Sequence, residues 1–504
     1  MMIYGFKEQT IRQSKPMKTM LFIFPVLLSL LFLSGCGGGG DSDNQTAEEI
    51  YQSSDAIDKF DTSNKLLNTL FKGVDPSRFF RSGDRVSLES ASAEYAPEAI
   101  KTLLDTPLDS RAVVFQRIDE YYAFDNNAKP LQYPITTLFE MPLSQDYFRF
   151  WMAYVLSNTI LFSPAVELDS VDIYDAQRVY HRLVNMMDES STISRIVYEH
   201  MISQENWRRF RSPEDNTREM MEIFLGRFID AEVPKASKAC QNWYLTDDGE
   251  GYQLVKTLNV NEESQAILDT EVTTCEEFYQ AVADHADLMP QIIKILVDYF
   301  YDGRSAADKQ RIVASLAGKG YRYFDDLFKA IIFSRSYLYE TERSKKYEEL
   351  FLGMADTISW YPTYYYFRDL NRQPSSTSLE TLLDMNQGSM RYKLGRFGAV
   401  PVDSLSFSYV HKAVRDRLFL DRRTNEFSIY DGGWRANFIT DVTLEEDQFI
   451  DYYFVALAGR MPTEEERTAL EEIFTAEGIA TNKEQRVVVM MDYISRLSEL
   501  YYFR

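Results

Sequence analysis

The chain has 504 residues and a formal net charge of −23. Apolar residues make up 45% of it and charged residues 26%, which is typical of a globular protein and argues against bulk disorder. The 22 glycines and 16 prolines are fewer than an average composition contains, so a turn-rich all-β fold is disfavoured. Because an acidic surface repels phosphate backbones, the charge predicts that nucleic acid is not a partner.

Residues 1–35 predict a signal peptide. An apolar stretch over residues 20–32 follows four basic side chains, Lys7, Arg12, Lys15 and Lys18. A helix of that length spans about 20 Å, which is too short to cross the hydrocarbon core of a bilayer. The long basic segment leaves Met1 and Met17 open as alternative translation starts.

Leu33-Ser34-Gly35-Cys36 ends this segment and resembles the lipobox of bacterial lipoproteins. The resemblance implies that cleavage makes Cys36 the N-terminus, carrying three acyl chains such as palmitate, enough for stable anchoring. Since Gly37 rather than aspartate follows, it also implies the outer membrane, with the body facing the periplasm or the cell surface. Residues 36–50 predict a flexible tether. The alternative is a chance cysteine behind an ordinary signal peptide.

Export would leave Cys240 and Cys275 as an even pair in an oxidising compartment, which predicts a disulfide. Closing a loop of that length stabilises a fold by roughly 4 kcal/mol in the chain-entropy model. The alternative is two buried thiols that do not meet. The spacing lacks the C-x-x-C pattern of zinc sites.

The rest of the chain predicts a mainly α, multi-helix globular body over residues 51–442, followed by a C-terminal three-helix segment over 443–504 that packs on it. Apolar periodicity predicts helices over 109–124, 145–162, 175–187, 192–203, 213–228, 288–301, 306–317, 323–334, 345–359, 444–458, 464–475 and 483–502. Residues 371–441 are rich in loop signals, which predict long loops, and long loops in a compact fold often carry function.

Several helix starts carry their own signal. Ser212 and Pro213 suit the cap and first position of one helix. Four capping boxes are predicted, at Thr274 with Glu277, Thr443 with Glu446, Thr463 with Glu466, and Thr481 with Glu484.

Arg218, Glu219 and Glu222 are the candidate catalytic residues. Helical spacing brings Arg218 within reach of both Asp215 and Glu222, with Glu219 on the same side. Such a cluster could bind a cation or a substrate. The alternative is an ion-pair network that orders a buried helix face.

Other chemical signals are weak. The four histidines do not pair at metal-ligand spacing, and G-x-S-x-G, C-x-x-C-H and G-x-x-x-x-G-K are absent, so neither a metal nor a cofactor is predicted. Trp360, Tyr361 and Tyr364 belong to an aromatic run that could stack on a glycan. The alternative for this run is core packing.

Residues 215–226, DNTREMMEIFLG, resemble the signature N-x-x-R-E-L-x-E-L-F-T-L-G of the bacterial domain of unknown function 1800 family. Residues 236–243, ASKACQNW, are similar to that family's A-A-R-A-L-T-G-W helix, and the resemblance extends over about 145–340. Asp215 and Asn242 depart from the pattern, and one residue is missing before Gly226. The resemblance implies a helical, exported protein of unestablished role, with a possible exported partner of the domain of unknown function 1501 family.

These features predict an envelope lipoprotein that acts as an accessory or binding protein for an exported partner or an envelope polymer. Its ligand is not indicated by the sequence. The alternative is an exported hydrolase that uses Arg218, Glu219 and Glu222.

Overall fold

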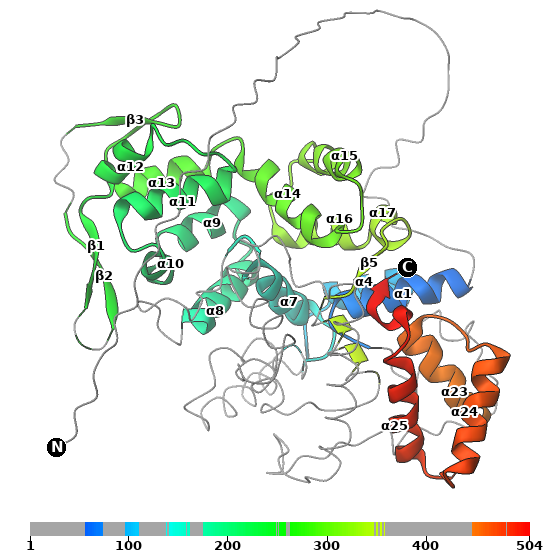
Figure 1. Cartoon of the computed structure of the whole chain (residues 1–504). Helices are drawn as coiled ribbons and strands as arrows, with labels where there is room; N and C mark the ends of the chain where they lie inside the picture. The colour runs from blue at the N-terminus through cyan, green and yellow to red at the C-terminus, as the bar shows by residue number, and fades with distance from the viewer. Residues whose placement is uncertain are drawn as a thin grey trace, which may run out of the picture. The chain divides into compact units, whose positions relative to one another are not determined.

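The computed structural model describes residues 56–73, 96–109, 138, 141–157, 159–161, 175–247, 249, 251–258, 263–346, 349–350, 353–354, 357, 446–479 and 481–503. Of these residues, 62% are helical, in sixteen α-helices, which confirms the mainly α class (Figure 1). The chain divides into units 1–44 and 45–504, and all described residues belong to the second unit. Cys36, the tether, the aromatic run at Trp360 and the segment 371–441 lie outside the described residues.

The helices before the disulfide are α1 (Ala56–Thr69), α4 (Pro97–Asp105), α7 (Gln145–Ser157), α8 (Asp175–Asp188), α9 (Ile193–Met201), α10 (Gln204–Arg209), α11 (Pro213–Leu225) and α12 (Val233–Ala239). Helix α7 is the apolar centre expected from the sequence. Trp151 on this helix stacks on Phe148 with ring centroids 5.6 Å apart, and its edge meets Phe328 at 5.5 Å. Both α4 and α16 (Phe324–Ile332) pack against α7, so this helix fixes their spacing.

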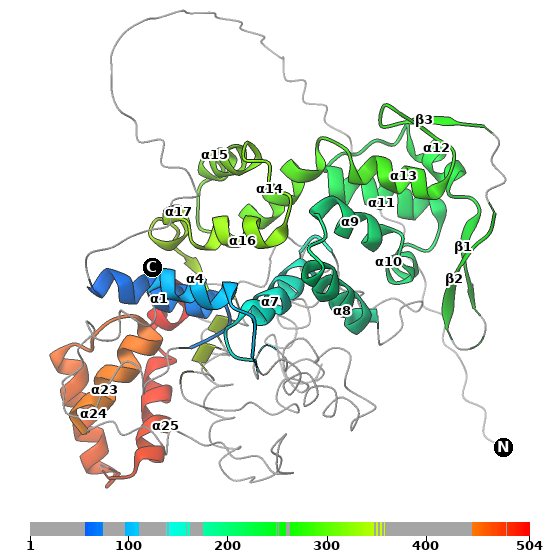
Figure 2. The ribbon, with the colours of Figure 1, turned by 180° about the vertical axis from the view of Figure 1, so that it is seen from behind.

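Two antiparallel hairpins interrupt the helices, and the sequence patterns did not predict them. They consist of β1 (Trp243–Asp247) with β2 (Tyr252–Lys256), and β3 (Gln265–Ile267) with β4 (Thr270–Val272) (Figure 2). Aromatic and β-branched residues favour the first pair of strands, and Gly249 and Gly251 take positive φ angles in the turn between them.

A disulfide closes the segment that carries both hairpins. Cys240 lies directly after α12, and Cys275 is the first residue of α13 (Cys275–Ala283). Their sulfurs are 2.08 Å apart and their Cα atoms 4.3 Å apart. The predicted disulfide is confirmed.

The following helices are α14 (Leu288–Phe300), α15 (Ala306–Ala317), α16 (Phe324–Ile332) and α17 (Arg335–Leu338), and they end in the short strand β5 (Arg343–Ser344). The C-terminal elements are α23 (Glu446–Tyr453), the π-helical turn η1 (Phe454–Ala458), α24 (Glu464–Ala476), α25 (Lys483–Ile494), the 3₁₀ turn η2 (Ser498–Tyr501) and β6 (Tyr502–Phe503). Strand β6 pairs with β5, and Tyr452 Oη donates to the Thr357 carbonyl at 3.0 Å. The C-terminal segment is therefore hydrogen-bonded to residues of the preceding body.

Three helices end earlier than the periodicity predicted. Helix α7 ends at Ser157 rather than residue 162, where the amides of Thr159 and Leu161 both turn back to the Leu156 carbonyl. Helix α11 ends at Leu225 rather than residue 228. Gly226 takes φ +65° there and forms a left-handed cap.

The last helix ends at Ile494, eight residues before its predicted end at residue 502, because the chain enters η2 and then β6. The expected helix over 345–359 was also wrong at its start, since Lys345 continues the extended segment of β5.

The capping boxes of Thr274 and Thr463 form as predicted, with reciprocal bonds to Glu277 and Glu466. The box at Thr481 was wrong. Helix α25 begins one residue later, and the Asn482 side chain caps it by accepting from the Gln485 amide at 3.1 Å. Asparagine is a stronger cap than threonine, which explains the choice. Thr443 lies outside the described residues.

Candidate functional site

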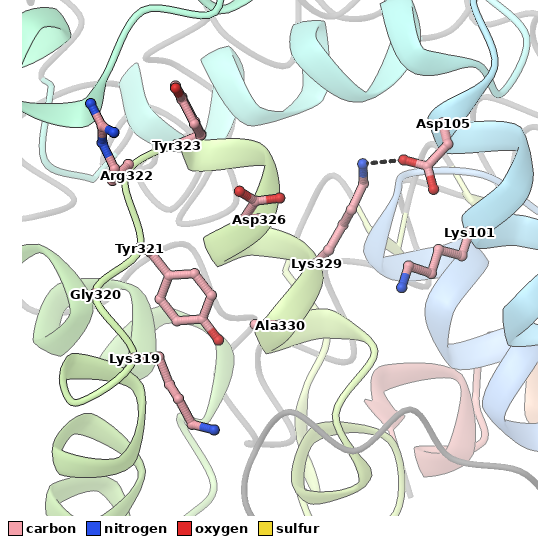
Figure 3. Close-up of a pocket in the computed structure, with 10 residues that line it drawn as sticks. All are labelled: Lys101, Asp105, Lys319, Gly320, Tyr321, Arg322, Tyr323, Asp326, Lys329 and Ala330. Atoms are coloured by element: carbon pink, nitrogen blue, oxygen red, sulfur yellow. Dashed lines mark hydrogen bonds and ion pairs between the residues drawn. The ribbon is translucent and has the colours of Figure 1, made fainter.

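A pocket of about 730 Å³ lies where α4 meets the α15–α16 connection and the first turns of α16 (Figure 3). We refer to it as the α4–α16 pocket. Its ten lining residues are Lys101, Asp105, Lys319, Gly320, Tyr321, Arg322, Tyr323, Asp326, Lys329 and Ala330. It has the size of a small-molecule site, and its polar side chains reach it from two separate segments of the chain.

Helix α4 supplies one wall through its amphipathic pattern. Pro97 at the start of the helix sets its first turn, and Ile100 and Leu104 are fully buried. Lys101 and Asp105 are also four residues apart, so they share the neighbouring face and line the pocket.

The α15–α16 connection supplies the opposite wall. Gly320 takes φ +67°, which lets the chain reverse between the two helices, and a Cβ there would meet no atom within 4 Å. Leu327, Phe328 and Ile331 bury the inner face of α16. The outer face of the same helix, which carries Lys329, therefore remains available to the pocket.

An ion pair joins the two walls. Lys329 Nζ lies 2.5 Å from Asp105 Oδ1, although the two residues are 224 positions apart. The lysine side chain is only 14% exposed, and its ammonium also lies 5.3 Å from the Phe148 ring centre on α7. This contact ties α4 to α16 and compensates one positive and one negative charge of the lining.

The hydroxyl of Tyr321 is shielded from solvent and has no hydrogen-bond partner in the part of the chain that the structure describes. An unsatisfied buried hydroxyl costs about 1–3 kcal/mol. In Figure 3 the Tyr321 ring carries this hydroxyl toward Lys319, and the Lys101 ammonium points inward from α4 on the other side. The hydroxyl therefore lies behind the surface of the pocket and is not exposed to its open volume.

The pocket is basic within an acidic chain. Four of its side chains are cationic and two are anionic, whereas the whole protein carries −23. Besides the Lys329–Asp105 pair, the lining carries Lys101, Lys319, Arg322 and Asp326. The local field favours ligands with negative charge.

The predicted catalytic residues lie on α11, away from this lining. Arg218 Nη2 pairs with Glu214 Oε1 at 2.8 Å, rather than with Asp215 or Glu222 as the spacing suggested. Both partners are partly exposed, at 37% and 64%. Loss of solvent, and then the charge of Glu219, raise the pKa of Glu222. The apolar side of the helix is buried as expected, and catalysis at these residues stays a prediction.

A second basic region is buried, and the sequence did not single it out. We call Lys65, Arg343, Lys345, Lys346 and Glu349 the buried cationic cluster; each is at most 4% exposed. Its cations come from α1 and from the short segment at β5. Four cations thus surround a single carboxylate.

Internal acceptors satisfy most of this cluster. The Arg343 guanidinium binds both Glu349 oxygens, at 2.7 and 2.5 Å, and donates to Tyr337 Oη at 2.9 Å. Lys65 Nζ donates to the carbonyls of Leu338 and Thr341. Burial acts to raise the pKa of Glu349, but the charge and hydrogen bonds of Arg343 together with those of Lys346 outweigh it, and the pKa is lowered.

Burial shifts the pKa values of two lysines in the cluster. Burial, and then the Arg343 charge, lower the pKa of Lys65 to about 7, against small opposing effects of Glu342 and Glu349. Burial also lowers the pKa of Lys345 to about 8. Lys346 Nζ donates to the Tyr299 carbonyl at 2.9 Å. The cluster holds α1 against the segment that follows α17.

Two sequence signals could have indicated these regions. The run Lys319-Gly320-Tyr321-Arg322-Tyr323 alternates cations and aromatics between two helices, and three basic residues fall within 343–346. Neither signal reveals the contact with α4 or α1, which is long-range.

No family model, curated protein or solved structure matches the chain. Within the described residues, none of the helices combines the length and apolar character needed to cross a membrane. The same residues contain no group of three or more His, Cys, Asp or Glu side chains placed to hold a metal ion.

Proposed function

We propose that this protein is an envelope lipoprotein, anchored through Cys36 to the outer membrane, that binds an exported partner or an envelope polymer. The signal peptide and the lipobox-like sequence support the anchor. The Cys240–Cys275 disulfide supports an oxidising compartment, where such bonds form and persist. The ligand site in this proposal is the α4–α16 pocket.

The observation that carries the binding role is the composition of the pocket. Its polar groups are amines, a guanidinium, carboxylates and tyrosine hydroxyls, and the ion pair within it consumes one cation and one carboxylate. The lining offers hydrogen-bond donors and acceptors from α4, α16 and the α15–α16 connection, which suits recognition of a polar ligand.

The test is capture from solubilised envelopes with the full-length protein. Ala330→Trp fills the pocket from α16, and Ala314→Trp on the exposed side of α15 is the matched control. We expect the wild type and the control to retain a common envelope component that the Ala330→Trp protein loses. Equal retention by all three proteins would contradict the proposed site.

The anchor has its own test. Cys36→Ser should release the protein from the membrane fraction, and unchanged fractionation would contradict lipidation.

Hydrolysis at α11 is the second candidate, because Glu222 has a raised pKa, as a general acid requires. If the protein hydrolyses an envelope substrate, Glu222→Gln should abolish that activity, while Glu263→Gln on the exposed Lys238 pair should not.

We also propose distant membership of the domain of unknown function 1800 family, with an exported protein of the 1501 family as a possible partner. Support comes from residues 215–226, which form α11 and end at Gly226, the last glycine of the resembling signature. Co-purification of the two proteins from one envelope preparation tests the partnership.

A further inference from the structure

We propose that the outer edge of strand β1 binds an extended, basic segment of a partner protein, which adds to the β1–β2 hairpin as a third strand. The inference goes beyond the proposed function, because no residue of β1 lines the α4–α16 pocket. It is argued from three observations: the closure of the β2 edge by α10, the unpaired main-chain groups of β1, and the residue types along β1.

Helix α10 closes the outer edge of β2, on which it packs (Figure 1). The Leu254 amide donates to Gln204 Oε1 at 2.9 Å. The Tyr252 carbonyl accepts from Arg208 Nε at 2.5 Å, and this arginine is only 2% exposed. Both Gln204 and Arg208 belong to α10. The chain therefore supplies side-chain partners along this edge of the hairpin.

The opposite edge of the hairpin, on β1, has no such partners. In an antiparallel pair, the main-chain groups of residues in register point either toward each other or both outward, in alternation. Since Leu254 and Tyr252 bond outward, their register partners Leu245 and Asp247 direct their amides and carbonyls away from β2. None of these four groups on β1 has a hydrogen-bond partner in the residues that the structure describes.

The residue types along β1 favour strand pairing and lack the usual protection of an edge. Natural proteins block exposed edges with lysine, proline or a bulge. Strand β1 contains neither lysine nor proline, and it keeps an unbroken register with β2 from Trp243 to Asp247. Tryptophan, tyrosine and threonine, which suit strands, make up most of it, and Tyr244 is 46% exposed. The open edge is therefore also an unprotected one.

The edge is held in place before a partner arrives. The Cys240–Cys275 disulfide closes the segment that carries the hairpin. At the base of the hairpin, Asn242 Nδ2 donates to the Thr257 carbonyl at 2.6 Å, and the Thr257 amide donates to the Asn242 carbonyl at 3.1 Å. Because β1 is already extended and fixed, a partner loses little binding free energy in ordering it.

The edge determines the chemistry of its occupant. The outward groups repeat at every second residue, about 7 Å apart, and an extended peptide main chain matches that spacing. Asp247 is the one charged residue of β1 and is exposed, and the whole chain carries −23, so a basic segment is attracted. A second copy of this chain carries the same negative charge and is repelled. The occupant is therefore a basic segment of another protein.

The experiment measures binding of synthetic peptides to the full-length, detergent-solubilised protein by fluorescence anisotropy. The probe is a peptide of about seven residues that alternates valine with lysine or threonine, long enough to cover β1. One control replaces its lysines with glutamate, and a second has every main-chain amide methylated. We expect the basic peptide to bind about tenfold or more tightly than either control, with an affinity that falls as salt rises.

Variants assign the binding to the β1 edge. Leu245→Pro removes an outward amide and should weaken the basic peptide about tenfold, whereas Leu258→Pro, at a residue that is 90% exposed, is the matched control and should leave binding unchanged. Thr246→Lys keeps the main chain intact and should weaken the basic peptide several-fold by repulsion. Ala314→Lys, on the exposed side of α15, is its control. The thermal midpoint of each variant shows whether it is folded.

The outcomes are decisive for the edge. No binding of the basic peptide, or equal binding of the acidic or methylated peptide, overturns the inference. So does unchanged binding by a folded Leu245→Pro protein or by Thr246→Lys. Dimerisation without peptide that Leu245→Pro abolishes would assign the edge to a second copy of the chain and would also overturn it. The proposed function is tested separately by Ala330→Trp in the α4–α16 pocket, and it stands or falls independently of the edge.

Discussion

Two basic regions of this acidic chain contrast with each other. In the buried cationic cluster, both terminal nitrogens of Arg343 bind Glu349, and backbone carbonyls accept from Lys65 and Lys346. In the α4–α16 pocket, cations from two walls line an open volume of about 730 Å³, and Lys329 pairs across it with Asp105. Basic residues therefore gather in two different surroundings in this chain, one buried and one open. In the cluster the cations are buried and join elements of the fold, whereas in the pocket an open volume remains between the walls and is suited to a ligand.

The largest expected effect is at the carboxylate of the buried cluster. Glu349→Gln leaves Arg343 buried without its counter-charge, and breaking such a pair costs about 3–5 kcal/mol. Chemical denaturation of the full-length protein measures the loss of unfolding free energy. Glu263→Gln removes an exposed carboxylate that pairs with Lys238, and it should leave the midpoint unchanged. Equal midpoints for both variants would contradict the structural role of the cluster.

The pH dependence of stability comes next. The pKa of Lys65 is about 7 in the folded protein and near 10.5 when unfolded. Between these values the unfolded state binds more protons, so stability rises with pH from 7 toward 10. The shift corresponds to roughly 5 kcal/mol, but the carbonyls that accept from Lys65 favour its charged form, so we expect about 2 kcal/mol.

Lys65→Met should reduce this rise in stability and leave the part that comes from Lys345, whereas Lys294→Met at an exposed site should not change it. Denaturation curves at several pH values provide the measurement. A slope that is identical in the wild type and in Lys65→Met would show that Lys65 does not release its proton on folding.

The same substitution in both regions gives the most direct comparison between them. Tyr337 Oη is hydrogen-bonded to Thr69 at 2.6 Å and to Arg343, so Tyr337→Phe should cost about 1–2 kcal/mol. Tyr321→Phe removes a hydroxyl without a partner in the described residues, and stability should stay unchanged or rise slightly. Thermal unfolding of the two variants tests this. A larger loss at Tyr321 would show that the pocket is satisfied from within.

The smallest expected effect is at the N-terminal cap of α25, which lies outside both regions. Asn482→Ala removes the cap of α25 and should cost about 1 kcal/mol. Thr481→Ala alters only the residue that the sequence pattern favoured, and it should be neutral. Unfolding midpoints measure both effects. A larger loss for Thr481→Ala than for Asn482→Ala would show that Thr481 caps the helix, as the sequence pattern predicted.

The sequence predicted the features that depend on neighbouring residues. Helix α15 was placed correctly from its periodicity, and the caps at Ser212, Thr274 and Thr463 are set by residues three positions away. The disulfide followed from the parity of two cysteines. The hairpins were missed because short strands between helices carry too few residues to establish a period.

The site could not be predicted in the same way. The pocket depends on α4 lying beside α16, with Asp105 and Lys329 distant in sequence, and helix packing alone creates that contact. Periodicity identifies which face of each helix is buried, but it does not identify the partner helix. Arg343 and Glu349 are close in sequence, but their burial depends on packing against distant parts of the chain. That burial is what makes the pair important for stability.

The most direct test of the central claim is photo-crosslinking in intact cells, with a photoreactive amino acid at Ala330 inside the pocket and, separately, at Ala314 outside it. Our account predicts that position 330 labels an envelope component and position 314 does not. Identical labelling from the two positions would show that the pocket is not where this protein binds.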